Sequence, residues 1–353
     1  MQAQVKLIIV VFVFCLELQG CKGNPPLGPS TLLLPKWVVF KTSNSGLVNN
    51  HVNAVLSDFE GGIWVGTDGG VSTYSGGSWN SFVDEFFFMT DKGVRSIITS
   101  MTEDPNRNLW FGLAGGGVVR YNEHDTTDVW WRYTIDDGLP YNYILSITAD
   151  LQHSEIWCAT MLGVARFVPE GNEGGVWHTY GLSNSTLPSN MVRCVVYNPI
   201  DSSIWFGTQY SGVTYISGDR RWQAPIVFPQ PGTYPIDAIA FDENSTWFGT
   251  EAGILQYATN ISVWRQYDSS TTNGLVPFGP VHAVTTNYTT TRWFGTNGGL
   301  LKLTDTLWTV MNRYNTLELP SDTVTALAYD IRGNLWIGTV NGVAVYNEEG
   351  TKF

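Results

Sequence analysis

Several residue types that mark particular protein classes are scarce in this chain of 353 residues. It has only four cysteines, which excludes a disulfide framework as the basis of the fold. Positive charge is scarce too, because 19 lysines and arginines stand against 31 acidic residues and leave a net charge of -12. Such a balance gives no basic surface for a nucleic acid and repels anionic lipid, so we expect neutral or cationic ligands.

Long apolar runs are also missing, apart from one near the N-terminus between Leu7 and Leu16. That run is long enough for the apolar region of a signal peptide and well short of the roughly 20 residues of a membrane-spanning helix. Directly after it, Leu18-Gln19-Gly20-Cys21 resembles the lipobox of bacterial lipoproteins. The resemblance implies a lipoprotein signal peptide at residues 1–20 and a lipid on Cys21. An ordinary secretory signal is the alternative.

The next segment is rich in glycine and proline, so we expect residues 21–36 to form a flexible tether behind the lipidated cysteine. Lys22 stands where an aspartate would accompany inner-membrane retention. The lipobox resemblance therefore implies the outer membrane, facing the periplasm or the cell surface. Residues 37–353 are expected to be one domain, because a repeat runs through them without an interior linker.

That repeat is a four-residue phrase, Trp-x-Gly-Thr, which occurs seven times with small changes and has no helical pattern between its copies. Successive tryptophans lie 42 to 48 residues apart, a period that indicates stacked or radially arranged units. The seven tryptophans are Trp64, Trp110, Trp157, Trp205, Trp247, Trp293 and Trp336.

Each repeat contains short apolar segments that we interpret as four antiparallel strands; in the first repeat they are 52–56, 63–67, 70–74 and 79–82. The strand that carries the phrase is apolar on both faces, which indicates sheets packed on both sides. The last repeat lacks a fourth strand, whereas Trp37-Val38-Val39-Phe40 precedes the first repeat without a sheet of its own. We therefore predict an all-β, seven-bladed β-propeller with four-stranded antiparallel blades, closed by Trp37–Phe40 in the last blade.

The phrase is followed by Gly-Val-x-x-Tyr and accompanied by a Gly-Leu loop, visible as Gly46-Leu47, Gly138-Leu139, Gly181-Leu182 and Gly274-Leu275. This combination resembles the two-component regulator propeller repeat. The resemblance implies the periplasmic sensor part of histidine kinases, often in glycan-responsive systems. Since no kinase segment follows before Phe353, we expect a stand-alone form without a histidine kinase.

Propellers generally bind ligands on the face that carries the loops leading into the first strand of each blade. Two positions there differ from repeat to repeat. The first lies two residues before the first apolar residue of the strand, and the second lies one residue after it. The divergence indicates an asymmetric ligand site, although a solvated channel mouth can also vary without a function. With nearby aromatic residues, the predicted ligand-binding set is Asn50, Asn53, Lys92, Arg95, Asn142, Asn190, Arg193, Asp237, His282, Asp322, Tyr141, Tyr210 and Tyr234.

No metal-ligand spacing, nucleophile elbow or phosphate-binding loop occurs among these residues, so we expect no catalytic residue, metal or cofactor. The expected function is that of a monomeric, membrane-tethered sensor-like or accessory protein that binds a small glycan or peptide fragment. Two alternatives remain open. One is a scaffold for an envelope protein, and the other is an enzyme similar to streptogramin lyase that uses His282.

Overall fold

The computed structural model describes residues 34–83, 97–122, 130–170, 174–226, 234–277 and 279–353. The predicted signal peptide, Cys21 and most of the tether lie outside these ranges, as do Lys92 and Arg95. The chain divides between Leu33 and Leu34 into two compact units, and the second unit holds everything described below. Within the described ranges, no helix has the length and apolar character that crossing a membrane would require.

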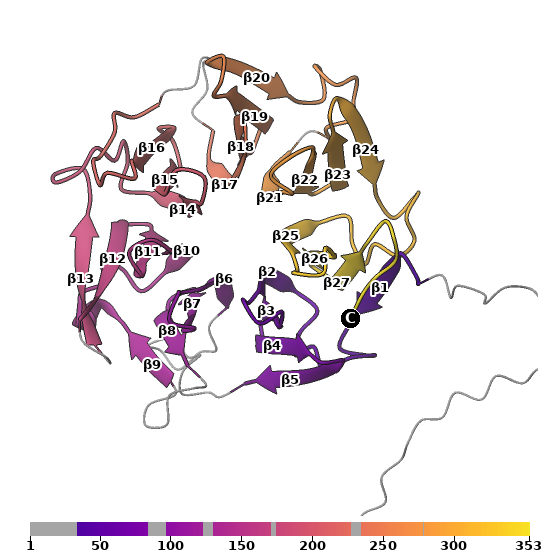
Figure 1. Cartoon of the computed structure of the whole chain (residues 1–353), viewed down its shortest axis with the longest axis horizontal. Coiled ribbons are helices and arrows are strands. Elements are labelled where there is room, and N and C mark those ends of the chain that lie inside the picture. Colours follow the sequence, from indigo (N-terminus) through magenta and orange to yellow (C-terminus); the bar gives the residue numbers. More distant parts are fainter. Residues whose placement is uncertain (1–33, 84–96, 123–129, 171–173, 227–233, 278) are drawn as a thin grey trace, which may run out of the picture. The chain divides into compact units, whose positions relative to one another are not determined.

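Seven antiparallel sheets stand in a ring, with their first strands innermost (Figure 1). Blade 1 contains β2 (Val52–Ser57), β3 (Ile63–Thr67), β4 (Gly70–Ser75) and β5 (Ser78–Phe82). Blade 2 contains β6 (Ile98–Glu103), β7 (Leu109–Leu113), β8 (Gly117–Tyr121) and β9 (Trp130–Tyr133). A short 3-10 helix, η1 (Ile135–Asp137), precedes blade 3, which contains β10 (Ile144–Asp150), β11 (Glu155–Thr160), β12 (Gly163–Glu170) and β13 (Gly174–Tyr180).

Blade 4 is a three-stranded sheet of β14 (Val192–Asn198), β15 (Ser203–Thr208) and β16 (Val213–Ile216). Blade 5 contains β17 (Ile236–Asp242), β18 (Ser245–Thr250), β19 (Gly253–Ala258) and β20 (Val263–Tyr267). Blade 6 contains β21 (Val281–Thr286), β22 (Thr291–Thr296), β23 (Gly299–Thr304) and β24 (Leu307–Met311). Blade 7 contains β25 (Val324–Tyr329), β26 (Leu335–Thr339), β27 (Gly342–Tyr346) and β1 (Trp37–Phe40). The predicted seven-bladed propeller is therefore confirmed.

The closing strand is confirmed as well, since β1 pairs antiparallel with β27 from Trp37 opposite Tyr346 to Phe40 opposite Val343. A second contact joins the two ends, because the Thr351 backbone N–H donates to the Pro35 carbonyl at 2.8 Å. Phe353 packs against Phe40, with 6.0 Å between ring centroids. These contacts tie residues from both ends of the described unit into the seam between blades 7 and 1.

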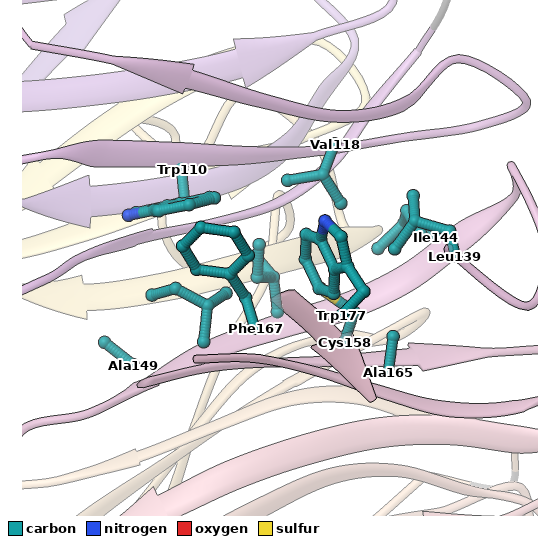
Figure 2. Close-up of a cluster of buried hydrophobic side chains, with 11 residues drawn as sticks. Trp110, Val118, Leu139, Ile144, Ala149, Cys158, Ala165, Phe167 and Trp177 are labelled. Atoms are coloured by element: carbon teal, nitrogen blue, oxygen red, sulfur yellow. The ribbon is translucent and has the colours of Figure 1, made fainter. Parts of the chain in front are cut away.

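Apolar side chains fill the seams between neighbouring blades. Figure 2 shows one seam, in which Trp110 and Val118 of blade 2 pack against Ile144 and Phe167 of blade 3. The glycine of the repeated phrase makes the close approach possible, because a Cβ on Gly112 would lie only 2.7 Å from the Ile144 side chain. The repeated phrase is thus a packing motif.

The indole N–H of the repeated tryptophan is bonded at the turn between the first two strands of its blade in most blades. It donates to an aspartate carboxylate of that turn in blades 1, 2, 5 and 7, at 2.7 to 2.9 Å. In blade 4 the acceptor is the Ser203 hydroxyl, and in blade 6 it is the Tyr329 hydroxyl of the next blade. A buried N–H needs such a partner, so these turns hold the tryptophans in one orientation.

The structure corrects one sequence interpretation of strand register. In blade 2, Ile98 pairs with Leu113 as Val52 pairs with Thr67 in blade 1, so the ring position one residue after the first apolar strand residue belongs to Thr99. Among the Gly-Leu loops, Leu182 and Leu275 are exposed, and the buried positions belong to Leu187 and Val276.

Candidate functional site

The first strand of every blade carries a β-bulge at the same place. In each strand the register shifts between the first apolar residue and the residue two positions later, so the residue between them has no partner in the ladder. A bulge re-aims the side chain that it contains. The seven bulged residues are Asn53, Thr99, Leu145, Arg193, Asp237, His282 and Thr325.

These bulges lie at one end of the ring, which we call the mouth. Within a blade, the second strand ends and the third strand begins beside the start of the first. In blade 1, Thr67 at the end of β3 pairs with Val52 at the start of β2 and with Gly70 at the start of β4. The loops that enter the first strands reach the same end, because a Cβ on Gly70 would lie 2.7 Å from the carbonyl oxygen of Phe82 at the end of β5. The mouth therefore combines bulges, second-to-third-strand turns and inter-blade loops.

A second ring of residues, which the sequence analysis missed, contacts the bulges. The Asn53 amide donates to Asp68 at 2.9 Å, Arg193 donates to Gln209 at 2.8 Å, and His282 Nε2 lies 2.9 Å from the Asn297 side-chain oxygen. A signal was present, because the residue after the repeated threonine differs in every copy. These residues are Asp68, Ala114, Met161, Gln209, Glu251, Asn297 and Val340.

Polar groups concentrate on blades 4, 5 and 6 of the mouth. The Arg193 guanidinium donates to the Asp237 carboxylate of the next blade and to the Gln209 amide of its own. We call the set Arg193, Gln209, Asp237, Glu251, His282 and Asn297 the polar arc. Its side chains range from Asp237, which is 11% exposed, to the exposed Glu251 and Asn297. The bond between Arg193 and Asp237 crosses a blade boundary, so a bound molecule can contact both blades at once.

Blade 3 gives the mouth an apolar side. Leu145 and Met161 stand where blade 4 has Arg193 and Gln209, and Leu162 beside them is exposed. The predicted site residues Tyr141, in the loop before β10, and Tyr210, in the turn after β15 of blade 4, are exposed too. A cavity of about 340 Å³ lies between the loops here, lined by Pro140, Leu162, Tyr180, Leu182, Ser183 and Asn190 among others.

Four of the predicted ligand residues also hold the loops of the mouth in place. Their side-chain oxygens accept a backbone N–H from the start of the preceding loop, at 2.7 to 2.9 Å. The corresponding pairs are Asn50 with Thr42, Asn142 with Ile135, Asn190 with Leu182, and Asp322 with Arg313. These four side chains contribute to loop structure, and their role in ligand binding stays a prediction. Tyr234 is half-buried just before β17.

Two of the bulged residues also serve the fold. The Thr99 hydroxyl donates to the Ile144 carbonyl of blade 3 at 2.8 Å, and the Thr325 hydroxyl donates to the Val52 carbonyl of blade 1 at 2.6 Å. These bonds join neighbouring first strands across a seam. The bulges of blades 2 and 7 are therefore structural, whereas those of blades 4 to 6 belong to the polar arc.

Nucleophilic and metal-binding groups are sparse in the part of the chain that the structure describes. No cluster of three histidine, cysteine or carboxylate side chains with metal-site geometry occurs there. Burial raises the pKa of the Cys158 thiol well above its usual range and that of Cys194 to about 12, so both thiols remain protonated. The lyase-like alternative for His282 stays a prediction.

The fold and the mouth define a seven-bladed β-propeller with an asymmetric polar face. A model of the two-component regulator propeller repeat matches residues 46–69 and 318–341. The chain is thus a seven-bladed propeller in which two segments match the two-component regulator propeller repeat. No functionally curated protein matches its sequence.

Solved propeller structures are similar to this one. The extracellular domain of the hybrid two-component system BT3049 from B. thetaiotaomicron is 20% identical with a TM-score of 0.66, over 89% of this chain and 42% of that chain. Streptogramin B lyase is 15% identical with a TM-score of 0.66, over 88% of this chain and 97% of that chain. PorZ, a surface component of the type-IX secretion system of Porphyromonas gingivalis, is 16% identical with a TM-score of 0.64, over 88% and 47%. At these identities the similarity is one of fold, and this chain spans about two fifths of the BT3049 domain.

Proposed function

We propose that this protein is an extracytoplasmic binding protein, sensor-like or accessory to a sensor, that holds a small glycan or peptide fragment at the mouth of its propeller. One observation carries the proposal. The seven bulges present six different side-chain types, with threonine in both blade 2 and blade 7, although the strands around them repeat. The similarity to the extracellular domain of a two-component system supports the same assignment.

The chemistry of the mouth supports this ligand class. The polar arc supplies amide, carboxylate, guanidinium and imidazole groups, and the blade 3 side supplies exposed leucine, methionine and tyrosine side chains. Small-molecule sites combine apolar surface with a few oriented polar groups in this way. A molecule with hydroxyl or amide groups on one side and an apolar face on the other would contact both sides.

A thermal-shift screen of the full chain against glycan fragments and short peptides tests the proposal. A ligand at 100 times its dissociation constant adds about 2.7 kcal/mol to the folded state and raises Tm. We expect at least one class of compound to raise Tm in the wild type and to lose that effect in the double variant Arg193→Ala/Asp237→Ala. A screen in which no compound changes Tm would reject the proposal.

We further propose that the chain is lipid-anchored in the bacterial envelope through Cys21, with the propeller outside the cytoplasm. The lipobox-like Leu18-Gln19-Gly20-Cys21 and the extracellular location of the similar propeller domain support this. In cell fractionation, the wild-type protein should appear with the membranes and Cys21→Ser should appear in the soluble extracytoplasmic fraction. Continued membrane association of Cys21→Ser would contradict the anchor.

A scaffold role is the second candidate, because a specific surface favours it. At the end opposite the mouth, five turns between first and second strands place an exposed apolar residue at their tips, namely Phe59, Leu151, Ile200, Tyr288 and Ile331. Exposed apolar surface of this kind is typical of protein contacts. If an envelope protein co-purifies with the wild type and with the mouth variant but not with Phe59→Ser/Ile331→Ser, the scaffold role would replace the ligand-binding one.

A further inference from the structure

A polar cavity of about 310 Å³ lies in the seam between blades 2 and 3, away from the mouth. Its walls include Asp104 and Asn108 from the turn before β7, and Arg120 near the end of β8. That turn lies at the end of the blade opposite the mouth. The reason is that β7 begins at this turn and ends at the turn between β7 and β8, which belongs to the mouth. The cavity is therefore separate from the site of the proposed function.

The wall of this cavity contains a buried arginine that has no hydrogen-bond or ion-pair partner among the described residues. Arg120 is only 6% exposed, and its Nε has no hydrogen-bond partner. No carboxylate of the described residues lies within ion-pair distance of its guanidinium, which packs 5.2 Å from the ring centroid of Trp131. An unpaired buried cation destabilises the folded state unless a counter-charge reaches it.

Other blades show what normally happens at this position. The residue opposite the repeated tryptophan is Arg166 in blade 3 and Lys302 in blade 6. Arg166 lies 3.8 Å from Glu155, and Lys302 lies 2.9 Å from Glu348. The cation at this register therefore has a carboxylate in blades 3 and 6, whereas the described part of blade 2 supplies none to Arg120.

Asp104, the carboxylate in the described cavity wall, already has hydrogen-bond donors on both of its oxygens. Asp104 accepts hydrogen bonds from the backbone N–H groups of Asn106 and Asn108, from the Asn108 side-chain amide and from the Trp110 indole, at 2.8 to 3.0 Å. Four donors satisfy both of its oxygens. Asp104 thus fixes the turn and the tryptophan, and the N–H of Arg120 remains available to a molecule in the cavity.

The rest of the wall suits a compact hydroxylated molecule. Trp110 and Phe167, whose ring centroids lie 5.2 Å apart, form the aromatic part of the wall (Figure 2). Asn106 and Ser154 add polar side chains. Cavities of about 300 Å³ and larger are the usual size of small-molecule sites.

We propose that this cavity binds a small hydroxylated carboxylate of the size of an acidic monosaccharide, with the carboxylate on Arg120. A guanidinium and a carboxylate form short, charge-assisted hydrogen bonds with matching planar geometry. The ligand supplies the counter-charge that the seam lacks, and its hydroxyl groups face the amides of the wall.

The test is a thermal-shift and calorimetric titration of the full chain with glucuronate and galacturonate at constant ionic strength. Glucose and sulfate serve as the neutral and the non-carboxylate comparison. The uronates should raise Tm in proportion to the logarithm of their concentration, and glucose and sulfate should not. No shift with either uronate, or an equal shift with sulfate, would overturn the proposal.

Two variants separate a binding role of Arg120 from a structural one. Arg120→Met should lose the uronate response, with at least about a tenfold fall in affinity, and its Tm without ligand should equal or exceed that of the wild type. Arg265→Met, which changes an exposed arginine on β20, should keep the response. If Arg120→Met lowers Tm by several degrees or fails to fold, Arg120 is structural and the proposal is rejected. Retention of the uronate response in Arg120→Met would reject it as well.

Discussion

The repeated tryptophans are held at two points, by ring packing in the seam and by a bond to the indole N–H. Blade 3 departs from this, because the Trp157 N–H has no partner. The aspartate of its turn, Asp150, is engaged instead by Arg220 of blade 4 and by His153, both at 2.8 Å. The turn aspartate can thus serve either the tryptophan or the neighbouring blade.

Ser203→Ala measures how much the indole bond contributes. The substitution leaves the Trp205 N–H buried without its acceptor, so the free energy of unfolding should fall by about 1–3 kcal/mol in urea titrations. Tyr329→Phe removes the corresponding acceptor of Trp293 beside a cavity of about 390 Å³. Water can reach that indole, so the second loss should be smaller. Equal losses would contradict this explanation.

The two buried thiols should be unreactive in the folded protein. With Cys15 and Cys21 changed to serine, neither Cys158 nor Cys194 should react with a thiol reagent at pH 8, because burial keeps both thiols protonated. In urea both should react fully. Rapid labelling of the folded protein would show that the seams open on the time scale of the assay.

Arg193→Ala tests the polar arc. Affinity for a ligand found by the screen should fall about tenfold or more, because a hydrogen bond to a charged group is lost. Tm should fall as well, because the Asp237 side chain is only 11% exposed and loses this ion-pair partner. The matched control is Asn50→Ala, which removes the same kind of loop bond in blade 1 and should lower Tm while leaving affinity near the wild-type value. If Arg193→Ala keeps its affinity and the loop variant loses affinity, the ligand binds at the loops and not at the polar arc.

The sequence located part of the mouth correctly, as Asn53, Arg193, Asp237 and His282 are bulged residues. It failed in blade 2, because apolar residues at both 94 and 98 fit the repeat, and only the pairing of Ile98 with Leu113 decides the register. Side chains two residues before the strand were predicted as ligands because they are polar. Their bonds to loop N–H groups depend on loop geometry that periodicity does not contain.

Among the elements, the closing strand was predictable from a count of strands and the outer strand of blade 4 was not. The sequence predicted four strands in each repeat, yet in blade 4 Trp222 forms only an isolated bridge with Ile216, and Ile226 forms another with Val213. Pro225 between them has no N–H to donate to a ladder. The blade keeps its tryptophan in the seam without a regular fourth strand.

Removal of β1 tests the closure. A chain without residues 34–40 loses the outer strand of blade 7 and the packing of Phe40 on Trp336, whose ring centroids lie 5.9 Å apart. Loss of several kcal/mol should lower Tm by roughly 10 °C. Removal of residues 1–33 is the control and should leave Tm unchanged, since those residues belong to a separate unit. A similar Tm for both truncations would show that β1 is dispensable.

Across the whole propeller, repetition and divergence lie in different places. The seams repeat in every blade because each must bury the same face. The mouth differs from blade to blade, with a polar arc over blades 4 to 6 and an apolar side over blade 3. The most informative comparison is therefore between the two ends of the ring.

Hydrogen–deuterium exchange of the full chain, with and without a ligand from the screen, makes that comparison directly. Amides at the bulges and mouth turns have weak protection in a ladder, so their exchange reports on a bound molecule. We predict slower exchange in peptides that cover residues 191–193, 208–212, 236–238 and 281–283, with no change in the turns at the opposite end. Protection confined to those opposite turns, with the mouth unchanged, would contradict a ligand site at the mouth.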